Sequence, residues 1–100
     1  MLLLGIDLGT SSVKVSVLDA GNGNVLASAQ YPETEAAIIS HHPGWAEQSP
    51  NQWWHDVKAA ILKLHAIGVY NPSDIGAIGI AYQMHGLVLV DSHQNVIRDS

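Results

Sequence analysis

The sequence contains no cysteine, so disulfide bonds and thiolate metal sites are excluded. A chain without disulfides suits a reducing compartment, and we therefore expect it to work in the cytoplasm. Basic residues are also scarce, because four Lys and Arg stand against nine Asp and Glu, for a formal net charge of −5. A general nucleic-acid surface or an anionic membrane surface needs clustered Lys and Arg, so neither class of partner is expected.

Long hydrophobic runs are missing as well. No apolar stretch approaches the roughly 20 residues that a membrane-spanning helix needs. The apolar start of the chain, residues 1–4, lacks the basic residues, the length and the cleavage site of a secretory signal peptide. We therefore expect neither a membrane anchor nor a leader here.

What the sequence does contain is enough apolar material for one modest core. Its 100 residues are 47% hydrophobic and 13% charged, which is typical of a globular protein. The apolar run Leu2–Asp7 predicts a strand buried on both faces. Alternation over Val13–Leu18 and Val25–Tyr31 predicts two more strands, separated by a turn in which Asn22-Gly23 suits positive φ. We expect these three strands to form an antiparallel meander.

A helix is predicted after an ordered loop. Ser49 can cap it, Pro50 fits its first position, and Gln52 completes a capping box. Apolar residues then recur at three- and four-residue spacing and predict one buried stripe, comprising Trp53, Trp54, Val57, Ile61, Leu64 and Ile67. Gly68 predicts the C-terminal end of the helix.

The last third of the sequence returns to strand patterns. Ile75–Ala81 predicts a second buried strand, in which Gly76 and Gly79 allow a close approach of backbones. The letters YQMHG interrupt this pattern, and two short strands follow over Leu87–Val90 and Val96–Ile97. The predicted fold class is therefore α/β, with a three-stranded meander, one helix and then further strands.

The most distinctive motif lies between the first two strands. Asp7 ends an apolar run, and Gly9, Thr10, Ser11 and Ser12 follow it. A glycine among small hydroxyl residues can form a concavity of N–H groups that suits a phosphate. A carboxylate alone would repel that phosphate, but a bridging Mg²⁺ reverses the sign of the interaction. The motif predicts a site for Mg²⁺ and a nucleotide tail. The alternative is a strand-end carboxylate that caps nearby N–H groups.

This stretch, GIDLGTSSVKV, resembles the first phosphate motif of the actin, Hsp70 and sugar-kinase superfamily, whereas no P-loop and no G-x-G-x-x-G is present. The resemblance implies part of an actin-like ATPase (ribonuclease H-like) lobe, with ATP and Mg²⁺ as cofactors. It implies that Asp7 is catalytic and orients the metal through water, and that Gly9, Thr10, Ser11, Ser12 and Lys14 bind the ATP phosphates. Lys14 is equally well explained as a solvated strand lysine.

Two further stretches, QMHG and PGWAEQSPNQWW, resemble the FGGY family of sugar kinases. Glycerol kinases have an Arg-Glu pair where this chain has Met84-His85, and the string QMHG resembles the version in kinases that act on xylulose. The resemblance implies that Gln83, Met84 and His85 bind the ketose. Imidazole can exchange hydrogen bonds with a sugar hydroxyl, and a thioether can cover an apolar edge. Without the resemblance, His85 would be interpreted as a structural histidine.

For an intact protein the resemblance implies ATP-dependent phosphorylation of D-xylulose at its 5-hydroxyl. The catalytic base and the adenine-binding lobe of the family lie downstream, so we expect residues 1–100 to be part of the N-terminal domain and inactive alone. The expected partner is a small-molecule ketose, and the open sheet edge also favours a homodimer. Trp45 and Glu47 either line the sugar cleft or pack within their loop.

Three alternatives stay open at this point. The chain could belong to another FGGY kinase, acting on ribulose, gluconate or glycerol. It could also come from a non-catalytic, sugar-responsive regulator on the same scaffold, or from an actin- or Hsp70-like nucleotide-binding module. An actin- or Hsp70-like module would have no reason to keep QMHG or PGWAEQ, whereas downstream sequence would separate a regulator from an enzyme.

Overall fold

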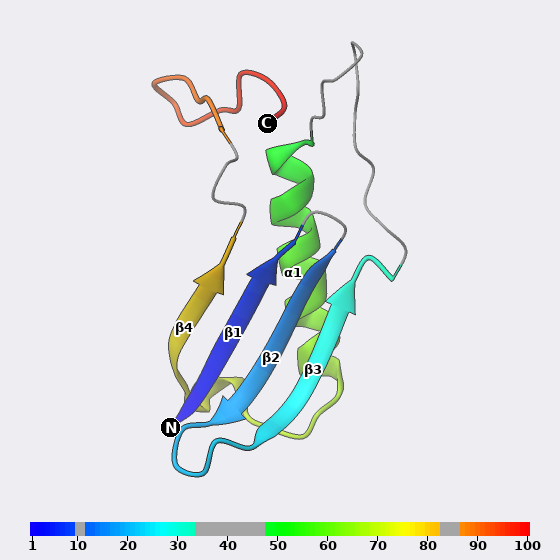
Figure 1. The fold of residues 1–100 in the computed structure, drawn as a ribbon, viewed down its shortest axis with the longest axis vertical. Coiled ribbons are helices and arrows are strands. Elements are labelled where there is room, and N and C mark those ends of the chain that lie inside the picture. The colour runs from blue at the N-terminus through cyan, green and yellow to red at the C-terminus, as the bar shows by residue number, and fades with distance from the viewer. Residues whose placement is uncertain (10–11, 34–47, 83–86) are drawn as a thin grey trace.

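Four strands and one long helix make up the part of the chain that the structure describes, residues 1–9, 12–33, 48–82 and 87–100 of a computed structural model (Figure 1). The elements are β1 (Leu2–Leu8), β2 (Val13–Asp19), β3 (Val25–Tyr31), α1 (Pro50–Ala66), the 3₁₀ turn η1 (Pro72–Asp74) and β4 (Ile75–Ala81). They form one sheet in the order β3-β2-β1-β4. The antiparallel meander of β1, β2 and β3 is confirmed, and β4 runs parallel to β1.

The turn between β2 and β3 is held by short polar side chains. Oδ1 of Asp19 accepts a hydrogen bond from the Gly21 N–H at 2.7 Å. Gly23 has a φ of 73°, so the positive φ expected of Asn22-Gly23 falls on the glycine. A residue without Cβ adopts that conformation at no steric cost.

Helix α1 begins and ends where its sequence signals predict. Oγ of Ser49 accepts a hydrogen bond from the Gln52 N–H at 3.3 Å, and Gly68, two residues beyond the last helical residue, has a φ of 77°. The capping box is only half formed, because the Gln52 side chain donates to Oδ1 of Asp56 at 2.8 Å. Neither described helix has the length and apolarity that crossing a bilayer requires.

The core lies between α1 and one face of the meander. Its buried members alternate along the strands and recur every four residues on the helix: Leu4, Ile6, Val13, Val15, Val17, Ala27, Ala60 and Leu64. Figure 1 shows α1 behind the sheet, where it packs chiefly against β2 and β3. Within the described residues, α1 therefore covers one face of three strands and leaves the other face open.

Two predictions about burial are wrong for this reason. The run Leu2–Asp7 is not buried on both faces, because only the side chains of Leu2, Leu4, Ile6 and Leu8 point toward α1. Trp54 was expected in the core, but it is 62% exposed and lies against the Lys58 ammonium group, and Ile67 is also exposed. Trp53 is half-buried, so the apolar stripe of the helix is narrower than its sequence suggests.

Strand β4 is exposed along nearly its whole length, which contradicts its predicted burial. It occupies the edge of the sheet beside β1, beyond the reach of α1, so Ile78 and Ile80 remain 59% and 62% exposed. What lies close to Gly76 is the side chain of Met1, with which a Cβ would collide, and not a neighbouring backbone. Gly79 has no such neighbour, so its predicted role is wrong.

Residues 87–100 form an irregular segment above the ends of β1 and β4 (Figure 1). The two short strands predicted there are reduced to one antiparallel bridge between Val90 and Val96. The turn between them is organised by the Asp91 carboxylate, whose Oδ1 accepts hydrogen bonds from the N–H groups of His93 at 2.8 Å and Asn95 at 2.9 Å.

Candidate active site

The Asp7 carboxylate lies near the C-terminal end of β1, on the sheet face that α1 does not cover. Alternation along β1 sends Leu4 and Ile6 into the core and leaves Asp7 exposed on the opposite face. Across the ladder Asp7 pairs with Lys14 on β2 and with Ala81 on β4. Within the described part of the chain no hydrogen bond or ion pair engages this carboxylate, so it is available to a ligand.

A shallow hollow of about 540 Å³ opens beside Asp7 on the uncovered face. Its floor is formed by residues with little or no side chain, among them Gly5, Ser16, Gly79 and Ala81, and Lys14 stands at its side. Small residues expose the backbone, and the hollow brings one carboxylate and one ammonium group to its rim. Ile6 and Ile80 also line the hollow, so an apolar surface adjoins these two charged groups.

The turn that follows β1 is tight at its base. The Gly9 N–H donates to the Ser12 carbonyl at 3.1 Å, and a Cβ on Gly9 would lie only 3.1 Å from that same oxygen. A side chain at Gly9 would therefore require the two backbones to move apart by a few tenths of an ångström. Ser12 is 7% exposed and forms the base of the turn, whereas the predicted phosphate contacts Thr10 and Ser11 lie outside the described residues.

The end of β4 adjoins the same edge of the sheet. Because β1 and β4 are parallel and Asp7 pairs with Ala81, both strands present their carboxyl ends together. Ligands of open α/β sheets bind outside the carboxyl ends of the strands. The predicted sugar contacts Gln83, Met84 and His85 follow Ala81 in the sequence and lie outside the described residues, as do Trp45 and Glu47.

The described residues hold no group of three or more His, Cys, Asp or Glu side chains that could bind a metal by themselves. A lone carboxylate fits Mg²⁺ only where water and phosphate oxygens supply the other ligands, and Mg²⁺ is commonly bound in this way. The donor set at Asp7 is thus compatible with a metal that arrives with a nucleotide.

Sequence reasoning missed one feature near this edge, the contact between Gln48 and Ser100. The Gln48 N–H donates to the Ser100 carbonyl at 2.7 Å, and the Ser100 N–H donates to the Gln48 carbonyl at 2.8 Å. No short motif predicts such a pairing, because the two residues lie far apart in the sequence. Its only local signal is an amide side chain directly before the helix cap Ser49.

Comparison with known proteins decides which family these features belong to. The N-terminal domain of the FGGY family of carbohydrate kinases matches residues 2–100. The chain belongs to this family. The resemblance expected from the phosphate turn and from QMHG is therefore confirmed, together with the actin-like ATPase fold of the FGGY kinases.

Individual FGGY kinases match the chain closely. Xylulose kinase from Escherichia coli (strain K12) is 43% identical over 99 residues, which cover 97% of this chain and 19% of that protein. Xylulose kinase from Bacillus subtilis (strain 168) is 39% identical over 100 residues, or 98% of this chain and 19% of the relative. The crystal structure of a xyloylose kinase from Brucella ovis superimposes with a TM-score of 0.88 at 38% identity, covering 99% of this chain and 20% of that one. The chain thus spans about a fifth of the length of these relatives.

Proposed function

We propose that residues 1–100 form part of the N-terminal domain of an FGGY kinase that transfers the γ-phosphoryl group of ATP to the 5-hydroxyl of D-xylulose. The observation that supports this best is the register of Asp7 with Ala81, which brings the phosphate turn and the end of β4 to one edge of the sheet. The xylulose kinases among the relatives support the choice of sugar. ATP, Mg²⁺ and a small-molecule ketose are the ligands of the proposal, and the cytoplasm is its setting.

In this proposal Asp7 and the turn after it bind the nucleotide tail. Asp7 holds Mg²⁺ through water, and Gly9, Thr10, Ser11 and Ser12 hold the phosphates. The Gly9 N–H itself donates to the Ser12 carbonyl, so Gly9 contributes by keeping side-chain bulk out of the turn. Lys14 pairs with Asp7 across the ladder and adds a positive charge on the same sheet face. The metal would neutralise charge on the phosphates during transfer.

Gln83, Met84 and His85 bind the ketose in this proposal. Holding two reactants in one orientation is the main requirement of phosphoryl transfer, since the enzyme performs little covalent chemistry of its own. A carboxylate must still accept the proton of the attacking hydroxyl. Within these 100 residues we assign that role to none.

The test is a coupled assay of ADP release by the full-length kinase that contains this chain. D-xylulose, ribulose, gluconate and glycerol are each supplied with MgATP. We expect the highest kcat/KM with xylulose, and no detectable turnover by the 100-residue chain alone. Preference for another of these substrates would reject the choice of sugar. Full-length protein that binds a sugar but never releases ADP would reject the enzyme in favour of a regulator.

A further inference from the structure

Asn22 and Gly23, in the turn between β2 and β3, form a dipeptide with a reactivity of its own. The main-chain nitrogen of the residue that follows an asparagine can attack the carbon of the side-chain amide. Glycine hinders this attack least, because it has no Cβ. Asn22 is the one asparagine of this sequence that precedes a glycine, since the other four precede valine, glutamine or proline. The sequence therefore concentrates this chemistry at a single position.

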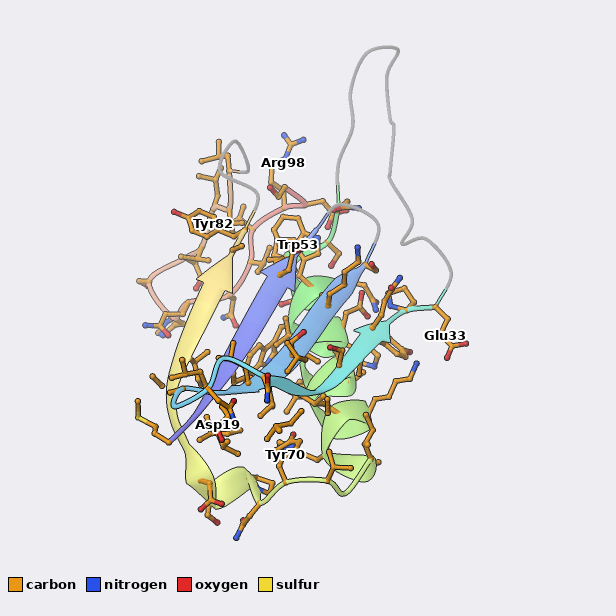
Figure 2. The ribbon with its side chains drawn as sticks, turned by 60° about the horizontal axis from the view of Figure 1, so that its bottom comes forward. Asp19, Glu33, Trp53, Tyr70, Tyr82 and Arg98 are labelled. Carbon is orange, nitrogen blue, oxygen red and sulfur yellow. The ribbon has the colours of Figure 1, made fainter. Side chains whose placement is uncertain are left out.

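The turn leaves room for the reaction. Asn22 and Gly23 are both exposed, and a Cβ on Gly23 would meet no atom within 4 Å. The turn lies at the opposite end of β2 from Ser12, about 20 Å away at the usual rise of a strand. Figure 2 shows Asp19, the last residue of β2, at the end of the sheet that comes forward in that view. Solvent therefore reaches the dipeptide, and the dipeptide is remote from the candidate active site.

The folded turn restrains both of the groups that would react. The Gly23 N–H donates to the Asp19 carbonyl at 2.8 Å, and Oδ1 of Asn22 accepts from the Asn24 N–H at 2.9 Å. The nitrogen must lose its proton before it can attack, so its bond to Asp19 opposes the reaction. The Asp19 side chain stabilises this arrangement, because its Oδ1 accepts from the Gly21 N–H at 2.7 Å. The reaction therefore requires the turn to open locally.

We propose that Asn22 is a site of spontaneous deamidation and that the hydrogen bonds of the β2–β3 turn set its rate. The Gly23 nitrogen loses its proton and forms a bond to the side-chain amide carbon of Asn22. The bond from that carbon to the amide nitrogen breaks, and the nitrogen takes up a proton and leaves as ammonia. Water then opens the cyclic imide at either carbonyl. The products are aspartate and isoaspartate, and each adds a negative charge, whereas isoaspartate also adds one carbon to the main chain.

The test follows the full-length kinase that contains this chain, folded in buffer and unfolded in guanidinium chloride, at mildly alkaline pH. Water enriched in heavy oxygen labels each new carboxylate. Trypsin releases residues 15–58 as one peptide, in which Asn24 and Asn51 are internal controls for Asn22. Fragment spectra locate the label. Asn22 should be modified faster than either control, and about fivefold more slowly in the folded protein than in the unfolded one, which is the worth of one hydrogen bond.

Two variants at Asp19 separate the hydrogen bonds of the turn from its charge. Asp19→Ala removes the acceptor of the Gly21 N–H and should raise the rate at Asn22 about fivefold in the folded protein. Asp19→Asn removes the same charge but keeps an acceptor, so its rate should stay within about twofold of the wild type.

Each part of the proposal can fail separately. Label that enters Asn24 or Asn51 before Asn22 would overturn the choice of site. Equal rates at Asn22 in the folded and unfolded wild type would overturn the role of the turn. An Asp19→Ala variant that reacts no faster than Asp19→Asn would overturn it as well. If Asp19→Ala does not fold, the comparison of folded with unfolded wild type decides.

Discussion

At the scale of single residues, the Asp7 carboxylate differs from the other acids that the structure places in turns. Asp91 and Asp19 accept hydrogen bonds from neighbouring backbone N–H groups and so stabilise their own turns. Asp7 is also an aspartate near the end of a strand, yet no described group donates a hydrogen bond to its carboxylate. The described residues therefore do not support a capping role for Asp7. Its exposed carboxylate is consistent with ligand binding.

Replacing Asp7 should affect turnover far more than folding. In the full-length kinase, Asp7→Asn removes the charge that would hold Mg²⁺, and we expect kcat to fall by roughly 10²-fold or more. Because the side chain is exposed, the melting temperature should stay within about 2 °C of the wild type. Steady-state kinetics and thermal unfolding measure the two effects. A kcat close to that of the wild type would refute the metal-binding role.

A side chain at Gly9 should weaken nucleotide binding. In Gly9→Ala the new Cβ would lie 3.1 Å from the Ser12 carbonyl oxygen, so the turn must shift by a few tenths of an ångström. We expect the KM for MgATP to rise roughly tenfold, about 1.4 kcal/mol of binding, with a smaller change in the KM for xylulose. Initial-rate kinetics with each substrate varied in turn test this. A selective rise in the KM for xylulose would place the turn at the sugar instead.

At the scale of secondary-structure elements, the sequence patterns predict whether a segment is a helix or a strand better than they predict whether it is buried. The alternation of Val13, Val15 and Val17 and the signals at Ser49 and Gly68 are local, so β2 and the ends of α1 could be predicted from neighbouring residues alone. Burial is not local. The sequence pattern of Ile75–Ala81 says that it is apolar, but whether a layer covers it depends on where α1 lies.

The same distinction holds at the candidate site. Asp7 and the glycine after it could be identified because a short motif requires them in a fixed order. The pairing of Asp7 with Ala81, and that of Gln48 with Ser100, could not be identified, since each depends on how distant segments dock.

Truncation of two residues of α1 should lower the stability to very different extents. Leu64 is completely buried, so Leu64→Ala should lower the free energy of unfolding by about 2–5 kcal/mol. Trp54→Ala removes a larger side chain, but one that is 62% exposed, and should cost less than about 1 kcal/mol. Urea unfolding of this chain measures both. A larger loss for Trp54→Ala would restore the interpretation of both tryptophans as core residues.

The Asp91 turn should weaken in acid. Hydrogen bonds from the backbone of Asn95, and then of His93, hold the pKa of the Asp91 carboxyl below its ordinary value. A carboxyl whose pKa is lower in the folded state contributes stability that is complete above its unfolded pKa. That stability is lost as the pH falls through the folded pKa. The amide resonances of His93 and Asn95 should therefore move as the pH falls below the ordinary pKa of an aspartate, and in Asp91→Asn this titration should disappear.

At the scale of the whole molecule, the chain has one well-covered half and one bare half. The β2–β3 side carries α1, and Lys63 of α1 reaches across to donate to Glu33 and to the Gln30 carbonyl. No described helix packs over the β4 side, and its outer edge pairs with no described strand. Figure 2 shows this asymmetry, with Glu33 on the covered side and Tyr82 on the bare one.

The bare edge should make the 100-residue chain self-associate. β4 contains no charge and no proline, the two features that commonly protect an edge strand. We expect concentration-dependent association in sedimentation velocity, and Ile80→Lys should suppress it by placing a charge beside that edge. Leu62→Lys adds the same charge at a residue of α1 that is 67% exposed and serves as the control. Equal suppression by both variants would show that net charge, and not the β4 edge, governs association.

The parallel pairing of β1 with β4 also has a consequence for biosynthesis. The turn after Asp7 is synthesised before β4, and the meander around it can form from contacts that are close in sequence. Its neighbour at the Ala81 end arrives only after three quarters of these residues have been made. A nascent chain arrested before that point would already have the hairpin of β1 and β2. It would lack the paired ends of β1 and β4, where the proposed nucleotide and sugar sites adjoin. Binding of both ligands should therefore begin only after β4 has paired with β1.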